Sequence, residues 1–502
     1  MLAPDYPVVV VGGGPIGLTA ALELAHHGIR CAVIEPRTVV EHSRPRAKTT
    51  SARTMELFRR WGAAQAIRDA APLKPEWSNR VTFATTATGA EIAHIDGCLG
   101  LSTPPEVSPE RGQQISQGAV EEVLRRLVAD RPLVDLFLGW RAVSADQGGE
   151  FVRVDIEGEH GTRRTLTARW GIGADGPRSI VRSTIGARYE GAAGGRPNVN
   201  ITFRSRGLAG LIPHPPSIHY WSVNPVSPGV VGPLDLDGTW WAISTGTARI
   251  DSDAQAAEVV RGLVGAEIDV EIIATDPWQA RMLLADRYRG GRLLIVGDAA
   301  HQNPPWGGHG FNTGVGDAVN ACWKLAAVLQ GWAPEELIDT YESDRRPIAA
   351  QTIRVAESNM ATLSIDLVEQ GGRGAELAER IVRDKSPEFH SDGLIFGYGY
   401  GPAASGFDAY RYIPRMIAGA RLPHRLVDGT PIHDLLGTGF TALGAGAESF
   451  RHAAGRAGIP LTVIDAPGET VLVRPDQHIA WAGGEPHDAE HVLSQAIAGR
   501  WT

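Results

Sequence analysis

A buried strand that runs into three closely spaced glycines constrains the fold of this chain more than any other feature. Residues Pro7 to Val11 are continuously apolar and mostly β-branched, as expected of a parallel strand covered on both faces. Gly12, Gly14 and Gly17 follow in a GxGxxG spacing, and apolar side chains then recur at helical intervals until Gly28. The pattern predicts the first strand–turn–helix unit of an α/β domain.

The same stretch carries the residue types that bind a dinucleotide. Gly12 permits a tight turn, Gly14 lets a pyrophosphate approach the backbone, and Gly17 lets the helix pack close to the strand. A second predicted strand, Arg30 to Ile34, ends in Glu35, which stands 21 residues after Gly14, the separation at which an acid reaches a ribose hydroxyl. We therefore expect a diphosphate on the helix N-terminus and a sugar on the glutamate. NAD and FAD share this half of the molecule, so the choice between them stays open here.

A later stretch favours a flavin. Leu293 to Val296 is predicted to be another buried strand, Asp298 closes it, and a long helix is predicted to begin near Asn312. Asp298 can accept a hydrogen bond from a sugar-like hydroxyl. The backbone amides of Gly310, Phe311 and Asn312 would lie at the positive end of the helix. Such amides suit a ring that becomes anionic, as reduced flavin does and nicotinamide does not.

Composition and spacing exclude several other classes. A chain of 502 residues exceeds one hydrophobic core, so two or three domains are expected. A net charge of −9 disfavours a nucleic-acid partner, and no run of 18 apolar residues predicts a membrane span. The N-terminus lacks the basic segment of a secretory signal, and Cys31, Cys98 and Cys322 form no CxxC motif, which favours a cytoplasmic protein without a dithiol or zinc site. No other spacing predicts a metal site, and no GxSxG predicts a nucleophilic serine.

Three motifs together resemble one family of flavoproteins. They are GGGPIGL from Gly12, ADGPRSIVR from Ala174, which follows a predicted hairpin, and GDAAHQNPPWGGHGFNTG from Gly297. In this order they resemble the class A FAD-dependent aromatic hydroxylases, over roughly residues 5 to 350. The branch that the sequence resembles contains phenol and 2,4-dichlorophenol 6-monooxygenases and hydroxylases that tailor polyketides.

The resemblance implies a fold and a set of FAD ligands. It implies a GR2-type Rossmann-like FAD-binding domain built from residues 1–180 and 280–390, a β-rich substrate domain at 181–279, and a connector with a thioredoxin-like C-terminal domain at 391–502. Asp175 would serve both FAD and NAD(P)H, and His309 stands where many relatives have glutamine. The residues implied to bind FAD are Gly12, Gly14, Pro15, Ile16, Gly17, Glu35, Arg37, Arg46, Gln117, Asp175, Asp298, Pro305, Gly310, Phe311 and Asn312.

The β-rich insert and the loop before the long helix offer side chains for a substrate pocket. An aromatic wall would suit a flat, apolar substrate, although ordinary core packing also explains any one of these residues. The candidates to contact the substrate are Tyr220, Trp221, Trp240, Trp241, Pro305 and Trp306. The candidates to deprotonate a phenol are His219, Tyr220, His301 and His309.

The resemblance implies a monooxygenase that uses FAD, NADPH or NADH, and O2. It would hydroxylate a phenolic or other electron-rich ring through a flavin C4a-hydroperoxide, in aromatic catabolism or in secondary metabolism such as antibiotic biosynthesis. No side chain need act as a covalent catalyst, because the cofactor carries the chemistry. Two alternatives stay open at this point: a flavin-dependent Baeyer–Villiger oxygenase acting on a polyketide ketone, and a non-catalytic flavin-binding module. The expected partner is a small aromatic molecule rather than a nucleic acid or a membrane, and a homo-oligomer stays open.

Overall fold

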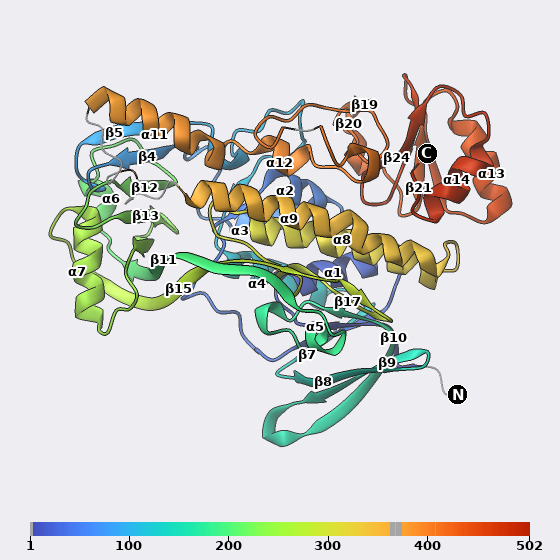
Figure 1. The fold of residues 1–502 in the computed structure, drawn as a ribbon, viewed down its shortest axis with the longest axis horizontal. Coiled ribbons are helices and arrows are strands. Elements are labelled where there is room, and N and C mark those ends of the chain that lie inside the picture. Colours follow the sequence, from blue (N-terminus) through green and yellow to red (C-terminus); the bar gives the residue numbers. More distant parts are fainter. Residues whose placement is uncertain (1–3, 362–366, 368–373, 407, 502) are drawn as a thin grey trace.

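A parallel sheet with the glycine-rich turn at its centre organises the computed structural model, which describes residues 4–361, 367, 374–406 and 408–501 (Figure 1). Its strands are β1 (Tyr6–Val11), β2 (Cys31–Glu35), β7 (Val134–Leu138), β10 (Arg163–Gly173), β16 (Arg289–Gly290) and β17 (Leu293–Ile295). Their order is β16-β17-β10-β1-β2-β7, and all neighbours from β17 to β7 run parallel. Buried Val8 of β1 lies opposite Trp170 on one side and Cys31 on the other. The apolar run thus occupies the doubly covered position that its composition predicts.

Smaller elements extend this domain. The predicted hairpin is present as β8 (Arg141–Gly148) and β9 (Phe151–Glu157), which pair antiparallel with each other and with β10. A two-stranded ribbon of β3 (Thr49–Thr50) and β6 (Gln113–Gln114) lies in the same part of the chain. The short helices of the domain are α2 (Ala52–Arg59), α3 (Ala63–Ala70) and α5 (Ile180–Thr184).

Long helices pack beside the sheet. α1 (Pro15–His26) contacts both α4 (Gln117–Ala129) and α8 (His309–Leu329), and α8 runs alongside α9 (Thr340–Met360) in Figure 1. The sequence favours a helix end at Pro347, but this prediction is wrong, because α9 continues through the proline. Side chains next to it hold the helix in place: Arg345 Nε lies 2.8 Å from Asp317 Oδ1 on α8, and both side chains are buried. Within the described part of the chain, no helix is long and apolar enough to cross a membrane.

A second, mostly antiparallel sheet lies beside the first and is drawn from two parts of the chain. Its strands are β4 (Val81–Ala84), β5 (Glu91–Ile95), β11 (Tyr189–Arg204), β12 (His219–Ser222), β13 (Gly229–Pro233), β14 (Thr239–Thr245), β15 (Glu271–Ala285) and β18 (His301–Gln302). Their order is β18-β15-β11-β14-β13-β12-β4-β5. Residues 81–95 therefore join this sheet rather than the first, since β4 pairs parallel with β12. The division at residue 180 expected from the sequence does not describe these two strands.

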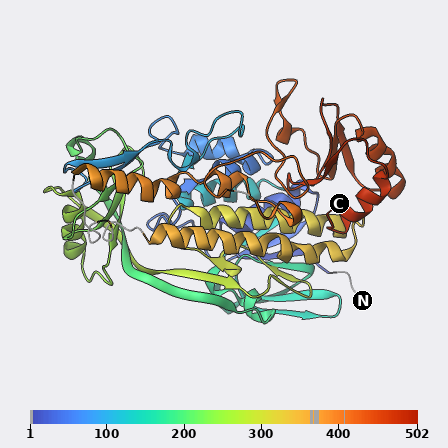
Figure 2. The ribbon, with the colours of Figure 1, turned by 45° about the horizontal axis from the view of Figure 1, so that its top comes forward.

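Helices cover both faces of the second sheet. α7 (Asp253–Val264) covers one face and α11 (Gly374–Phe389) the other (Figure 2). Tyr220 and Trp240 belong to the cluster under α7, whereas Trp221 and Trp241 belong to the cluster under α11. The short helix α6 (Leu208–Leu211) follows β11.

A four-stranded sheet forms the C-terminal domain, which lies at one end of the molecule in Figure 1. Its elements are β21 (Phe440–Leu443), α13 (Ala447–Ala457), β22 (Leu461–Ile464), β23 (Thr470–Val473), β24 (Ile479–Gly483) and α14 (Ala489–Ile497). β21 and β22 are parallel, whereas β23 and β24 are antiparallel, in the order β22-β21-β23-β24. This is the thioredoxin-like arrangement that the resemblance implies. The connector carries α12 (Asp392–Phe396) and the small pair β19 (Leu426–Val427) and β20 (Thr430–Pro431).

The C-terminal domain docks on the far end of α8. Trp323 of α8 and the nearby Trp332 form one buried cluster with Phe440 of β21. Polar contacts reinforce the junction: Asn320 of α8 donates to Asp476 at 2.9 Å. The helix whose N-terminus faces the site described below is therefore fixed at its other end by this domain.

Candidate active site

A cavity of about 1140 Å³ opens where the parallel sheet ends and meets the second sheet. Its wall includes Gly12 after β1, Glu35 at the end of β2, Ala174 after β10 and Val296 after β17. Ligands of α/β sheets bind outside the carboxyl ends of the strands. The cavity is larger than the roughly 300–1,000 Å³ typical for one small ligand. Its volume and position suit a dinucleotide together with a second molecule.

The glycine turn has the geometry that its spacing predicts. Gly12 has φ of +104°, and a Cβ there would lie 2.4 Å from the carbonyl oxygen of Ala174. A Cβ on Gly17 would lie 1.8 Å from the carbonyl oxygen of Gly12, so Gly17 lets α1 approach the turn and itself lies outside the cavity wall. A Cβ on Gly14 would meet no atom within 4 Å. Gly14 caps α1 without a side-chain hydrogen bond and Pro15 follows, so the first amides of the helix remain available to a ligand.

Glu35 lies at the cavity edge and is held in place by its neighbours. Its side chain accepts hydrogen bonds from the backbone N–H of Gly13 at 2.9 Å and from that of Arg37 at 3.0 Å. Arg37 also donates from Nε to Glu35 at 2.7 Å and pairs with Glu121 at 2.9 Å. Both Glu35 and Arg37 line the cavity. The carboxylate is thus fixed at the place where a ribose is expected.

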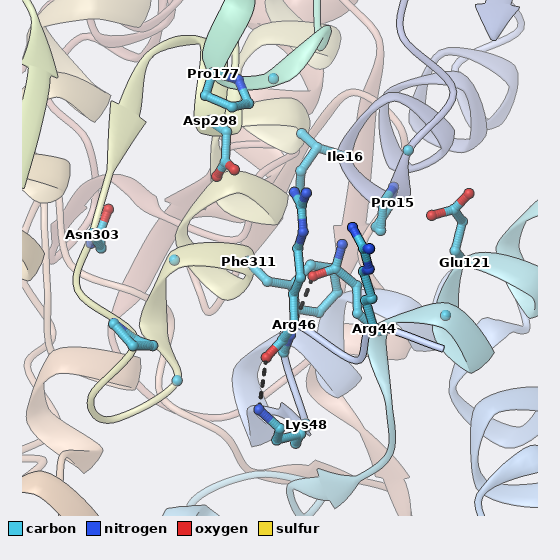
Figure 3. Close-up of a pocket in the computed structure, with 18 of the residues that line it drawn as sticks. Pro15, Ile16, Arg44, Arg46, Lys48, Glu121, Pro177, Asp298, Asn303 and Phe311 are labelled. Carbon is cyan, nitrogen blue, oxygen red and sulfur yellow. Dashed lines mark hydrogen bonds between the residues drawn. The ribbon is translucent and has the colours of Figure 1, made fainter. Parts of the chain in front are cut away.

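Basic side chains line the middle of the cavity. Arg46 extends toward Ile16 in Figure 3, with Asp298 on the other side of its guanidinium. Gln117, at the start of α4, lines the same region and accepts weakly from the N–H of Ala47 at 3.4 Å. Both Arg46 and Gln117 are among the residues that the resemblance implies to bind FAD.

Two carboxylates face the cavity from the ends of β10 and β17. Asp175 Oδ2 accepts from the N–H of Ile180 at 2.7 Å, whereas its buried Oδ1 has no hydrogen-bond partner among the described residues. Asp298 is exposed to the cavity (Figure 3). Desolvation raises the pKa of both carboxyls. Because Asp175 Oδ1 has no partner and Asp298 faces the cavity, each carboxyl group can accept a hydrogen bond from a hydroxyl group of a ligand.

The start of α8 faces the cavity, one turn earlier than the sequence predicts. The helix begins at His309, its cap Gly308 has φ of +68°, and no side chain caps it. His309, Gly310 and Phe311 line the cavity. The amide of Asn312, at the fourth helical position, falls where the internal ladder begins.

Asn312 itself does not line the cavity, which corrects the expectation that it contacts the ligand. Its side chain accepts from the N–H of Ser51 at 2.9 Å and donates to the carbonyl of Gly308 at 2.7 Å. It therefore fixes the helix start against the segment that carries Arg46.

Only one face of the second sheet reaches the cavity. Trp221 and Trp241 line it, together with Pro305 and Trp306 of the loop before α8. Tyr220 and Trp240 do not, because alternate residues of a strand point to opposite faces. Tyr220 OH accepts from the N–H of Ser217 at 3.0 Å, and Trp240 Nε1 donates to the carbonyl of Ser205 at 3.2 Å. These two aromatic residues belong to the core under α7, not to the pocket.

Of the four candidate bases, two line the cavity and two do not. Tyr220 lies on the opposite face, and His301 is buried outside the cavity, 2.8 Å from Asp317. Desolvation opposes the charge of His301, but Asp317 outweighs it and raises the pKa of the imidazole. His219 and His309 do line the cavity. Burial lowers their pKa to about 3 and about 4, so both are neutral at physiological pH and are weak bases.

Several cavity residues were missed by sequence reasoning. Arg44 and Lys48 line the cavity and stand two residues on either side of Arg46, so the spacing of an extended segment could have found them. Glu388 and Phe389 also line it, from the end of α11. No local pattern links that helix to the cavity, since only the tertiary fold brings it there.

Comparisons with known protein families agree with this geometry. A family model described as "FAD binding domain" matches residues 5–356, and a second, described as "Aromatic-ring hydroxylase, C-terminal", matches residues 415–501. Among characterised relatives, a 4-methyl-5-nitrocatechol 5-monooxygenase of Burkholderia sp is 32% identical over 98% of this chain and 97% of its own length. A putative polyketide hydroxylase of Streptomyces halstedii is 31% identical with the same coverage.

Solved structures resemble the whole chain. The flavin-dependent monooxygenase PieE, in complex with FAD and substrate, superimposes with a TM-score of 0.88 at 27% identity, covering 99% of this chain and 100% of that one. The rebeccamycin biosynthetic enzyme RebC with reduced flavin gives a TM-score of 0.88 at 30% identity, covering 98% and 99%. The similarity therefore extends over both sheets and the C-terminal domain.

Proposed function

This chain belongs to the FAD-dependent aromatic-ring hydroxylases, and from that membership we propose that its cavity holds FAD beside a phenolic substrate. The observation that carries the proposal is one continuous cavity lined both by the glycine turn after β1 and by the start of α8. FAD needs both, because its adenosine diphosphate half and its isoalloxazine ring lie at opposite ends of the molecule.

The donors and acceptors of the cavity fit FAD. The space beside Gly14 and the free amides at the start of α1 suit a diphosphate. Glu35 suits the ribose, and the unpartnered Oδ1 of Asp175 suits a hydroxyl donor. In this assignment Gly12, Gly14, Pro15, Ile16, Glu35, Arg37, Arg46, Gln117, Asp175, Asp298, Pro305, Gly310 and Phe311 contact FAD. Gly17 and Asn312 do not contact FAD in this assignment. Gly17 lets α1 pack closely against the turn, and Asn312 fixes the position of the start of α8.

The chemistry supplied by bound FAD is acceptance of a hydride from NADPH or NADH and activation of O2, with one oxygen atom entering the substrate ring and the other leaving as water. The contribution of the chain is electrostatic and steric. The free amides of His309, Gly310 and Phe311 present partial positive charge to the cavity, which would stabilise the negative ring of reduced FAD. Trp221, Trp241 and Phe389 exclude water from the substrate end and orient a flat ring.

The test begins with the cofactor. The purified protein should be yellow and should release FAD on denaturation. NADPH or NADH oxidation should then be stimulated by one or more phenols. The product should contain one additional oxygen atom, and this atom should be 18O when the reaction is run under 18O2. A protein that binds no flavin, or a product that is a lactone or ester, would contradict the proposal.

A further inference from the structure

Lys48 stands at the substrate end of the cavity, among aromatic side chains. Its Nζ lies 4.3 Å from the centroid of the Trp241 ring. His219 packs edge-on against Trp241, with ring centroids 5.8 Å apart, and lies 5.6 Å from the ring of Phe389. In Figure 3 the Arg46 guanidinium reaches toward Ile16, whereas the Lys48 ammonium lies at the other end of Arg46, next to its carbonyl oxygen. Lys48 thus lies at the aromatic end of the cavity, whereas Arg46 points toward the start of α1, next to the glycine turn.

The charge of Lys48 is not balanced by a neighbouring acid. Its Nζ donates one hydrogen bond, to the carbonyl oxygen of Arg46 at 3.3 Å. Among the residues that the structure describes, none places a carboxylate within 4 Å of it. Desolvation lowers the pKa of Lys48 to about 8. A half-buried ammonium with two unused donors, lining a cavity, favours an anion opposite it.

The other charged groups at this end do not supply that anion. Glu388 lines the cavity, but Lys385 pairs with it three residues away on α11. The same Lys385 Nζ lies 4.4 Å from the ring centroid of Trp221. Desolvation raises the pKa of Glu388. His219 is neutral, because burial lowers its pKa to about 3. Among the described residues at the aromatic end, Lys48 is therefore a cation without an acidic partner.

We propose that Lys48 selects an aromatic substrate that carries an ionised oxygen, either a phenolate or a carboxylate, by binding that oxygen while Trp221 and Trp241 hold the ring. The inference rests on the proposed function and adds the substrate class to it. A phenol bound against this ammonium ionises at lower pH than in water, since the nearby cation stabilises the phenolate. A phenolate ring is richer in electrons than the neutral phenol, so the same contact also favours attack on an oxygen donor.

The experiment measures binding to the oxidised holoenzyme, without a reductant. The ligands form two matched pairs: 4-nitrophenol with neutral 4-nitroanisole, and 4-nitrobenzoate with neutral 4-nitrobenzamide. The absorbance of the bound flavin reports affinity, and the absorbance of 4-nitrophenol also reports its own ionisation. The variants are Lys48→Met, which keeps the length and removes the charge, Lys48→Arg, which keeps the charge, and Lys74→Met as a control at an exposed lysine outside the cavity.

The wild-type protein and Lys74→Met should prefer the anion of at least one pair over its neutral partner. Lys48→Met should weaken binding of that anion at least tenfold, about 1.4 kcal/mol, with little change for the neutral ligand. Lys48→Arg should restore most of the preference. Loss confined to 4-nitrophenol, with a raised pKa of the bound ligand, identifies phenolate as the anion; loss confined to 4-nitrobenzoate identifies carboxylate.

The proposal is overturned if the wild-type protein prefers neither anion, or if Lys48→Met weakens the anion and its neutral partner equally. The flavin content of each preparation separates the two hypotheses. A protein without flavin would count against the proposed function, whereas a flavin-loaded protein whose preference does not depend on Lys48 would count against Lys48 alone.

Discussion

Replacement of Gly14 by alanine tests whether the open space beside this residue is needed for a ligand or for packing of the protein. Gly14 has φ of −72° and ψ of −178°, which alanine adopts without strain, and its added Cβ would meet no protein atom within 4 Å. Gly14→Ala should therefore leave the free energy of unfolding of the apoprotein unchanged or raise it by about 0.4–1 kcal/mol, because alanine restricts the unfolded chain.

The same methyl group should weaken FAD binding. If the diphosphate lies against Gly14, the methyl group must displace it, at a cost comparable to overpacking, about 1–3 kcal/mol. That cost corresponds to a roughly 5- to 150-fold increase in Kd. The assays are urea unfolding of the apoprotein and titration with FAD, followed by quenching of flavin fluorescence.

Two further glycines provide the comparison. Gly207 also has a negative φ and open space around its missing Cβ, but it lies at the start of α6, outside the cavity. Gly207→Ala should match Gly14→Ala in stability and bind FAD as the wild type does. Gly17→Ala should destabilise the apoprotein, since its Cβ would overlap the carbonyl of Gly12. Normal FAD affinity in Gly14→Ala, or a loss of its apoprotein stability, would refute the reasoning.

Three other predictions follow from the site and the domain junction. Trp241→Phe should weaken substrate binding several-fold, because Trp241 lines the cavity. Trp240→Phe should leave substrate affinity unchanged and lower the unfolding free energy by roughly 0.5–1.5 kcal/mol, because it loses the hydrogen bond of the indole N–H. Equal substrate affinities in the two variants would contradict the assignment of Trp241 and Trp240 to opposite faces of the sheet. The affinity for an aromatic carboxylate should fall as the pH rises through about 8, since Lys48 loses its proton there, and a titration of Lys48→Met should lack this transition. Arg421 of the connector pairs with Glu56 of α2, and both side chains are buried. Arg421→Met should lower the unfolding free energy by about 3 kcal/mol, because the buried Glu56 carboxylate then keeps Arg53 but loses its second arginine partner. Acid unfolding of this variant should move to higher pH, since Arg421 helps to hold the pKa of Glu56 well below its usual range, and an unchanged urea midpoint would argue against a stabilising role of this ion pair.

Local patterns sufficed for the elements whose neighbours lie close in sequence. The β1–α1–β2 unit, from the apolar run at Val8 to Glu35, follows from the periodicity of its apolar residues and from its glycines. Gly12 and Gly28 have positive φ, which glycine adopts without strain. The cofactor follows from three motifs in a fixed order, because each motif ends a strand of one sheet.

Other features depended on contacts that no local pattern records. The start of α8 lies at His309 because Gly308 turns the chain there and Asn312 holds the neighbouring segment. α9 passes through Pro347 because buried pairs such as Arg345 with Asp317 hold it against α8. These long-range contacts outweigh local helix signals.

By itself, the sequence predicted that a βαβ unit binds a dinucleotide and that a β-rich region contributes to a substrate pocket, because residue spacing along one strand or helix fixes which side chains share a turn or an end. The choice of FAD came from the resemblance of three motifs to those of one family. Only the tertiary structure decided which aromatic residues reach the cavity, that β4 joins the second sheet, and that Glu388 and Lys48 line the same space. The physical reason is the period of two in a strand: a register chosen by distant partners sends Trp241 into the cavity and Trp240 into the core.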